Sequence, residues 1–131
     1  YYQTMTIILK NMIGMCMFPP INPNMATDII QAVTGWDTSL FELFKAAERG
    51  WTMARAFNTR EGFTVKDDKL PDRYFEPFTS GPLEGVAYDR ENFERCKQLY
   101  YQLAGWDKET GKPTEAKYID LDMPWLAEKM A

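Results

Sequence analysis

The stretch that decides the fold is Ser39–Gly62, which reads "SLFELFKAAERGWTMARAFNTREG". Ser39 followed three residues later by Glu42 is a capping-box pattern, which marks the start of a helix. The apolar residues after it recur at helical spacing and form one stripe: Leu40, Phe44, Ala47, Trp51 and Ala54, widened by Phe41 and Leu43. This pattern predicts a long helix to about Glu61, within which Gly50 allows a close contact with another helix.

Weaker patterns precede this helix. Residues 1–9 suit either a helix or a strand. Phe18–Asn24 holds three prolines, so we expect regular structure to stop there. Met25–Val33 has apolar residues at helical spacing and is followed by Gly35, which predicts a short helix with a glycine stop.

Three more helices are predicted after a long irregular segment. Asp67–Gly85 is rich in Pro, Gly and aromatic residues, and we expect it to lie across the surface of the bundle with at most one helical turn. Asp89 is the expected cap of a helix that ends near Gly105, with an apolar stripe of Phe93, Cys96, Tyr100 and Leu103. Thr114 and Asp122 are the expected caps of two short helices.

The fold class follows from these elements. No run of residues alternates apolar and polar side chains over the length of a strand, and we find no internal repeat. The prediction is all-α: an irregular helical bundle with long Pro/Gly-rich loops. A length of 131 residues fits a single helical domain over residues 1–131. Because the first residue is Tyr1 and not a methionine, we expect either a fragment of a larger protein or a processed product.

Composition excludes several classes of function. The net charge is −4 and the basic residues are scattered, so nucleic acid is not an expected partner. No apolar run is long enough to cross a membrane, and the absence of a signal segment favours the cytoplasm. The chain has no histidine, which rules out Ser–His and Cys–His catalysis, and two distant cysteines cannot form a zinc site alone.

The two cysteines have different expected environments. Cys16 lies between Met15 and Met17, just before two prolines. As a lone thiol it is either a small buried hydrophobic residue or a metal ligand that needs partner thiolates from elsewhere. Cys96 lies in an apolar helical stripe and is expected in the core.

Two other features have structural interpretations. The arginines of the long helix are expected to pair with carboxylates such as Glu48 and Glu61 rather than with phosphate: Arg49, Arg55 and Arg60. Gly-Trp-Asp occurs at Gly35 and again at Gly105, and each copy predicts a helix stop followed by an aromatic anchor. From composition and periodicity alone, the chain is a soluble helical domain without a complete site.

Longer strings are more specific. They are "TGWD" at Thr34–Asp37, "ERGWTMARAFNTREGFTVKDDKLPDRYFEP" at Glu48–Pro77 and "YYQLAGWDKETGKPT" at Tyr100–Thr114. In order and spacing, these strings resemble the C-terminal region of the aldehyde:ferredoxin oxidoreductase family, over approximately Asn11–Leu121. The family pattern Arg-x-Phe-Asn-x-Arg-Glu-Gly-Phe is matched at Arg55–Phe63. The pattern Asp-Asp-x-Leu-Pro that follows it is matched at Asp67–Pro71.

The resemblance implies a role for Cys16. Family members hold one cubane iron–sulfur cluster, with three closely spaced cysteines upstream and a fourth in the pattern Asp-x-x-Gly-x-Cys-x-Phe. Here that pattern reads "NMIGMCMF" at Asn11–Phe18, so the resemblance makes Cys16 the metal ligand. It also implies that Asn11, Met15 and Met17 approach the tungstopterin. Asn11 replaces the usual aspartate and loses its negative charge, and Ala47 stands where a glycine is usual.

The resemblance also implies an activity for the intact protein. Such enzymes oxidise aldehydes with water to carboxylic acids and pass electrons to ferredoxin. This region would contribute one cluster ligand and no catalytic residue, and the isolated chain is expected to hold neither the iron–sulfur cluster nor the tungstopterin. Its expected partners are the remainder of the oxidoreductase, ferredoxin and a second copy of the chain. The alternative is a non-catalytic helical interaction module or subunit that lacks cofactor.

Overall fold

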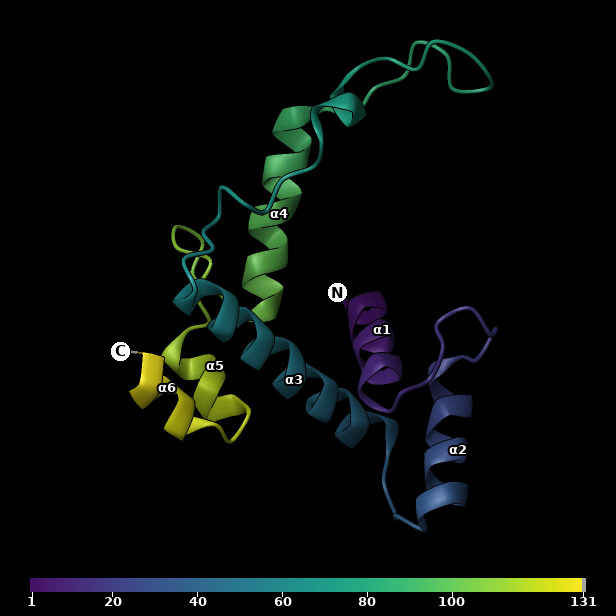
Figure 1. The fold of residues 1–131 in the computed structure, drawn as a ribbon, viewed down its shortest axis with the longest axis vertical. Helices are drawn as coiled ribbons and strands as arrows, with labels where there is room; N and C mark the ends of the chain where they lie inside the picture. The colour runs from purple at the N-terminus through teal and green to yellow at the C-terminus, as the bar shows by residue number, and fades with distance from the viewer. Residues whose placement is uncertain (131) are drawn as a thin grey trace.

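The computed structural model describes residues 1–130, and it is built from helices joined by loops (Figure 1). The helices are α1 (Tyr2–Met12), α2 (Pro23–Thr34), α3 (Leu40–Arg60), α4 (Arg90–Ala104), α5 (Glu115–Asp120) and α6 (Pro124–Met130), with a 3-10 turn, η1, at Asp72–Phe75. Over residues 1–130 the only β-pairings are isolated bridges, so the predicted all-α fold is confirmed. None of these helices combines the length and hydropathy needed to cross a bilayer.

The long helix α3 runs through the middle of the molecule, with α1 and α2 beside its first half and α5 and α6 beside its second (Figure 1). The predicted capping box starts it: the Ser39 backbone N–H donates to Glu42 Oε2 at 2.8 Å, and the Glu42 N–H donates to Ser39 Oγ at 3.3 Å. Two orphan amides of the first turn are satisfied in this way. The helix ends at Arg60, close to the predicted boundary.

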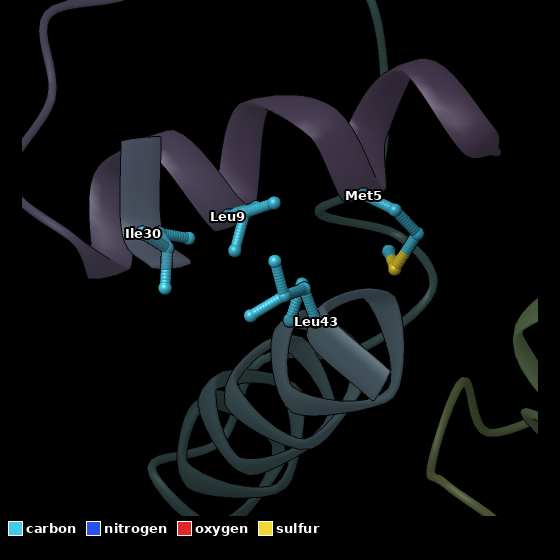
Figure 2. Close-up of a cluster of buried hydrophobic side chains, with 5 residues drawn as sticks. Met5, Leu9, Ile30 and Leu43 are labelled. Atoms are coloured by element: carbon cyan, nitrogen blue, oxygen red, sulfur yellow. The ribbon is translucent and has the colours of Figure 1, made fainter. Parts of the chain in front are cut away.

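The first core cluster joins α1, α2 and α3 (Figure 2). Its side chains are all at least nine-tenths buried: Met5, Leu9, Ile30, Leu43 and Ala47. This packing settles the conformation of residues 1–9 as helix, because α1 places Met5 and Leu9 on one face, one turn apart. Each buried aliphatic side chain of this size contributes about 1.5–3 kcal/mol.

Two smaller clusters complete the core. One packs Ala56 of α3 against Tyr118, Leu121 and Met123 at the α5–α6 turn. The other gathers Tyr101, Ala104 and Trp106 at the end of α4, where Trp51 of α3 packs against them. The core is therefore distributed along α3 rather than collected at one centre.

The core face predicted for helix α4 is wrong. The stripe of Phe93, Cys96, Tyr100 and Leu103 is not a core face, since Cys96 is exposed and Leu103 is 63% exposed. Only the last turns of α4 reach α3, and the residues buried there are Tyr101 and Ala104. The remainder of α4 extends away from α3 (Figure 1).

The Pro/Gly-rich segment forms the single predicted turn, η1, but does not cover the bundle. Its first part lies beside α4, where Phe75 packs edge-on against Phe93. Beyond η1 it projects past the N-terminal end of α4 as an arm (Figure 1). The arm is held by its own backbone, with the Phe78 N–H donating to the Val86 carbonyl and the Tyr88 N–H to the Tyr74 carbonyl, both at 3.0 Å.

The helix stops are correct as predicted, but one anchor and one cap are not. Gly35 and Gly105 both adopt left-handed conformations that end α2 and α4. Trp106 is an anchor, at 5% exposed, whereas Trp36 is 64% exposed. Asp122 has φ 55° and closes α5 instead of capping α6, since the Met123 N–H donates to the Tyr118 carbonyl.

Candidate functional site

The loop that carries Cys16 starts from a tight helix end. The Met15 N–H donates to the Lys10 carbonyl at 2.8 Å, and the Gly14 N–H donates to the Asn11 carbonyl at 3.2 Å. These two bonds form a Schellman motif, with Gly14 left-handed at φ 69°. The motif ends α1 and directs the chain outward immediately before Cys16.

The thiol of Cys16 is free and exposed on this loop. Met17 and Phe18 beside it are 49% and 89% exposed, and Asn11 is exposed in the last turn of α1. Met15 is half-buried. The interpretation of Cys16 as a small buried hydrophobic residue is therefore wrong for this chain, and the apolar residues on both sides of it are largely exposed as well.

Two contacts anchor the base of the loop to the helices. A Cβ at Gly50 of α3 would lie 2.7 Å from Sδ of Met12, so the glycine does permit the close helix contact predicted for it. Lys10 is buried, and its ammonium group donates to the Pro19 carbonyl at 3.4 Å. The Cys16 loop is thus ordered although its side chains face outward.

The chemistry available at this loop is that of one thiolate. Among residues 1–130 no group of three or more His, Cys, Asp or Glu side chains is placed to hold a metal ion. A four-cysteine cluster would need three further thiolates from elsewhere. The thiol of Cys16 fits that requirement, since it is free and exposed among residues 1–130. The amide of Asn11 could donate and accept hydrogen bonds nearby.

A second polar site is built around Arg55 in α3, which we call the Arg55 cluster: Arg55, Asp68, Tyr101, Trp106 and Gly111. The guanidinium donates to both carboxylate oxygens of Asp68, at 2.9 and 2.6 Å, and Nε donates to the Gly111 carbonyl at 2.7 Å. Its plane lies over Trp106, with Cζ 4.7 Å from the ring centroid. Tyr101 donates its hydroxyl proton to Asp68 as well.

The electrostatics of the Arg55 cluster favour the charged pair. Burial alone would raise the pKa of Asp68, but the hydrogen bonds from Arg55 and Tyr101 outweigh it and hold that pKa below its usual value. Burial, together with the hydrogen bond to Asp68, raises the pKa of Tyr101 to about 12. Arg55 and Tyr101 direct these donors at acceptors within the cluster, which joins α3, α4 and two loops, whereas the buried indole N–H of Trp106 has no hydrogen-bond partner among residues 1–130.

The Arg55 cluster unites the sequence strings that are far apart in the chain. Arg55 and Asp68 come from the string at Glu48–Pro77. Tyr101 and Trp106 come from the string at Tyr100–Thr114. The pairing of Arg55 with a carboxylate was predicted, but its convergence with the aromatic residues was not. Arg60 pairs with Glu61 at 2.9 Å, whereas Nε of Arg49 donates to a backbone carbonyl.

A third polar group surrounds Glu48. This buried carboxylate accepts from Tyr1 and Lys117 and lies 3.3 Å from the ammonium group of Lys45. Burial would raise its pKa, yet the hydrogen bonds from Lys117 and Tyr1 keep the pKa of Glu48 below its usual value. Glu48 therefore pairs with Lys45 and Lys117 and not with an arginine as predicted. The neighbouring Arg49 instead donates from Nε to the Leu121 carbonyl.

The comparisons with known proteins decide the family. The model of the aldehyde ferredoxin oxidoreductase family, domains 2 and 3, matches residues 1–123. The chain belongs to this family. A tungsten-containing aldehyde ferredoxin oxidoreductase of Pyrococcus horikoshii is 34% identical over 127 residues, covering 93% of the chain and 20% of that protein. One from Thermococcus kodakarensis is 35% identical over 107 residues, covering 78% and 17%.

One further relative and one solved structure are also similar to this chain. The WOR-like subunit of an aliphatic sulfonate oxidoreductase of Pyrococcus furiosus is 44% identical over 50 residues, covering 38% of the chain and 8% of that protein. The active-site complex BamBC of benzoyl coenzyme A reductase, solved with 1,5-dienoyl-CoA, has a chain that superposes with TM-score 0.78. That match is 25% identical and covers 98% of the chain and 19% of the other. The chain spans about a fifth of the length of the tungsten-containing relatives it matches.

Proposed function

We propose that this chain is the C-terminal part of a tungstopterin and iron–sulfur aldehyde:ferredoxin oxidoreductase, to which it contributes one cluster ligand, Cys16. The intact enzyme would convert an aldehyde and water to a carboxylic acid and pass the electrons to ferredoxin. The chain supplies no catalytic residue of its own, so its part is ligation, positioning and packing.

The observation that carries the proposal is the exposed, free thiol of Cys16 on an ordered loop. Free cysteines without a ligand role are usually buried, although Cys96 on α4 is exposed as well. A cluster ligand instead has to face the polypeptide that brings the remaining thiolates, and its backbone has to be fixed beforehand. The Schellman end of α1 and the contact between Met12 and Gly50 provide that fixed backbone.

The other predicted site residues fit a supporting role. Asn11, Met15 and Met17 lie on the same helix end and loop as Cys16. Bound tungstopterin would supply the redox chemistry on the aldehyde. Asn11 would hydrogen-bond to it through a neutral amide, and the methionines would keep water from the thiolate and tune the cluster potential.

Metal analysis of the intact protein tests this proposal. We expect tungsten and iron to co-purify with the full-length protein prepared anaerobically from its native source, together with aldehyde-dependent reduction of ferredoxin. A full-length preparation without either metal would contradict the proposal. That result would favour a non-catalytic helical module, the function suggested by Asn11 in place of the usual aspartate and by the single ligand at the Cys16 loop.

A further inference from the structure

Lys10 carries the only charged side chain among residues 1–27 of the sequence. It lies in the last turn of α1 and is 7% exposed. Among residues 1–130 its ammonium group pairs with no carboxylate, and its one hydrogen bond goes to the Pro19 carbonyl. Burying a cation is costly unless an opposite charge compensates it, and the partial negative charge at a helix end compensates it only weakly. Lys10 therefore lacks a full counter-charge within the described part of the chain.

Lys10 also fixes both ends of the segment that contains Cys16. Its backbone carbonyl accepts from the Met15 N–H at 2.8 Å, and its ammonium group donates to the Pro19 carbonyl at 3.4 Å. Residues 15–19 therefore form a loop that starts and ends at contacts with one residue. The free thiol of Cys16 is exposed within that loop. Removing the ammonium group would release the far end of the loop and leave the helix end held by backbone alone.

We propose that Lys10 is a positioning residue for the iron–sulfur cluster: its ammonium group holds the loop that presents Cys16 and compensates the charge of the cluster. This inference rests on the proposed role of Cys16 as a ligand. Four thiolates give such a cluster a net negative charge, which increases when the cluster takes up an electron. A buried cation at the base of the ligand loop stabilises the reduced form more than the oxidised form, and so raises the reduction potential.

Redox titration of the full-length protein tests this inference, with the cluster followed by electron paramagnetic resonance. Lys10→Met removes the charge and the donor but keeps most of the side-chain length, whereas Lys10→Arg keeps both. The matched control, Lys108→Met, removes an exposed lysine from the loop between α4 and α5, near the opposite end of α3 from α1 (Figure 1). We expect Lys10→Met to weaken reduction at least about tenfold, which lowers the one-electron midpoint potential by about 59 mV or more. Lys10→Arg and the control should stay near the native value.

The outcomes separate this inference from the proposed function. A midpoint potential and iron content unchanged in Lys10→Met would overturn the role of Lys10 and leave Cys16 as a ligand. If Lys10→Met loses its iron, retention of iron by Lys10→Arg supports the inference, because the loop then needs the charge and the donor. Equal losses of iron or of potential in both Lys10 variants would overturn it, since altered packing would explain them. Native full-length protein without iron would contradict the proposed function, and this inference with it.

Discussion

Arg55 combines burial, charge and planarity in one side chain. Its side chain is 8% exposed and that of Asp68 is 33% exposed, so their ion pair is shielded from water on the arginine side. A guanidinium fits this site better than an ammonium group, because the planar fork can serve both carboxylate oxygens and stack on Trp106 at once. Removing either partner leaves the other charge without compensation.

The first prediction concerns Asp68→Asn. We expect a loss of about 2–3 kcal/mol in the free energy of unfolding, which is below the range for fully buried pairs because Asp68 is partly exposed. The control is Asp67→Asn: the neighbouring carboxylate is exposed and, within residues 1–130, accepts hydrogen bonds from Thr64 alone. Urea denaturation followed by circular dichroism would measure both. Equal losses for the two variants would show that the Arg55 cluster carries no special stability.

The pH dependence of the same pair gives a second prediction. The folded-state pKa of Asp68 lies below its unfolded value of about 3.9, so its contribution is complete above that pH and is lost as pH falls through the folded pKa. The stability difference between the native chain and Asp68→Asn should therefore be constant near neutrality and shrink below about pH 4. A difference that stays constant down to pH 2 would contradict the assigned shift.

At the scale of elements, helix ends determine where the loops go. Capping residues are visible in sequence, which is why the start of α3 and the stops at Gly35 and Gly105 were correctly predicted. The burial of α4 was not, because a helical stripe shows which side chains share a face but not whether that face has a neighbour. Cys96 fails as a core prediction for this reason. The anchor predicted at Trp36 fails separately, because a tryptophan after a helix stop is buried only where another element packs over it.

A third prediction compares two left-handed glycines. A Cβ on Gly111, at φ 70°, would overlap Nη2 of Arg55, whereas one on Gly81, at φ 86°, meets nothing within 4 Å. Gly81→Ala should cost about 1–2 kcal/mol from backbone strain alone. Gly111→Ala should cost about 3 kcal/mol or more, because it also displaces the arginine from its paired carboxylate. Thermal denaturation of both variants would check this, and equal costs would argue against the close approach.

At the scale of the whole molecule, the chain is open. Its three core clusters are small and lie along α3. Large apolar side chains are exposed on α4, on the arm beyond η1, and on α2 at Met25, Ile29 and Val33. The family could be recognised from the strings at residues 48–77 and 100–114, because recognition requires only the identity and order of the residues. The convergence of those strings on Arg55 depends on three-dimensional packing and became visible only in the fold.

The fourth prediction follows from this openness. The isolated chain should bind a hydrophobic dye such as ANS and self-associate at micromolar concentration, whereas the full-length protein should bind much less dye for its size. Fluorescence titration and analytical ultracentrifugation would measure the two effects. A strictly monomeric isolated chain that binds no dye would contradict the expectation that these exposed apolar side chains drive association.

The central claim is that Cys16 is a cluster ligand, and the most direct measurement is the iron content and visible absorbance of full-length protein carrying Cys16→Ala. The matched control is Cys96→Ala, because Cys96 is the other free, exposed cysteine of the chain. We predict that Cys16→Ala loses the iron–sulfur absorbance and its bound iron, while Cys96→Ala keeps both. If Cys16→Ala retained iron and absorbance equal to those of the control, Cys16 would not be a ligand.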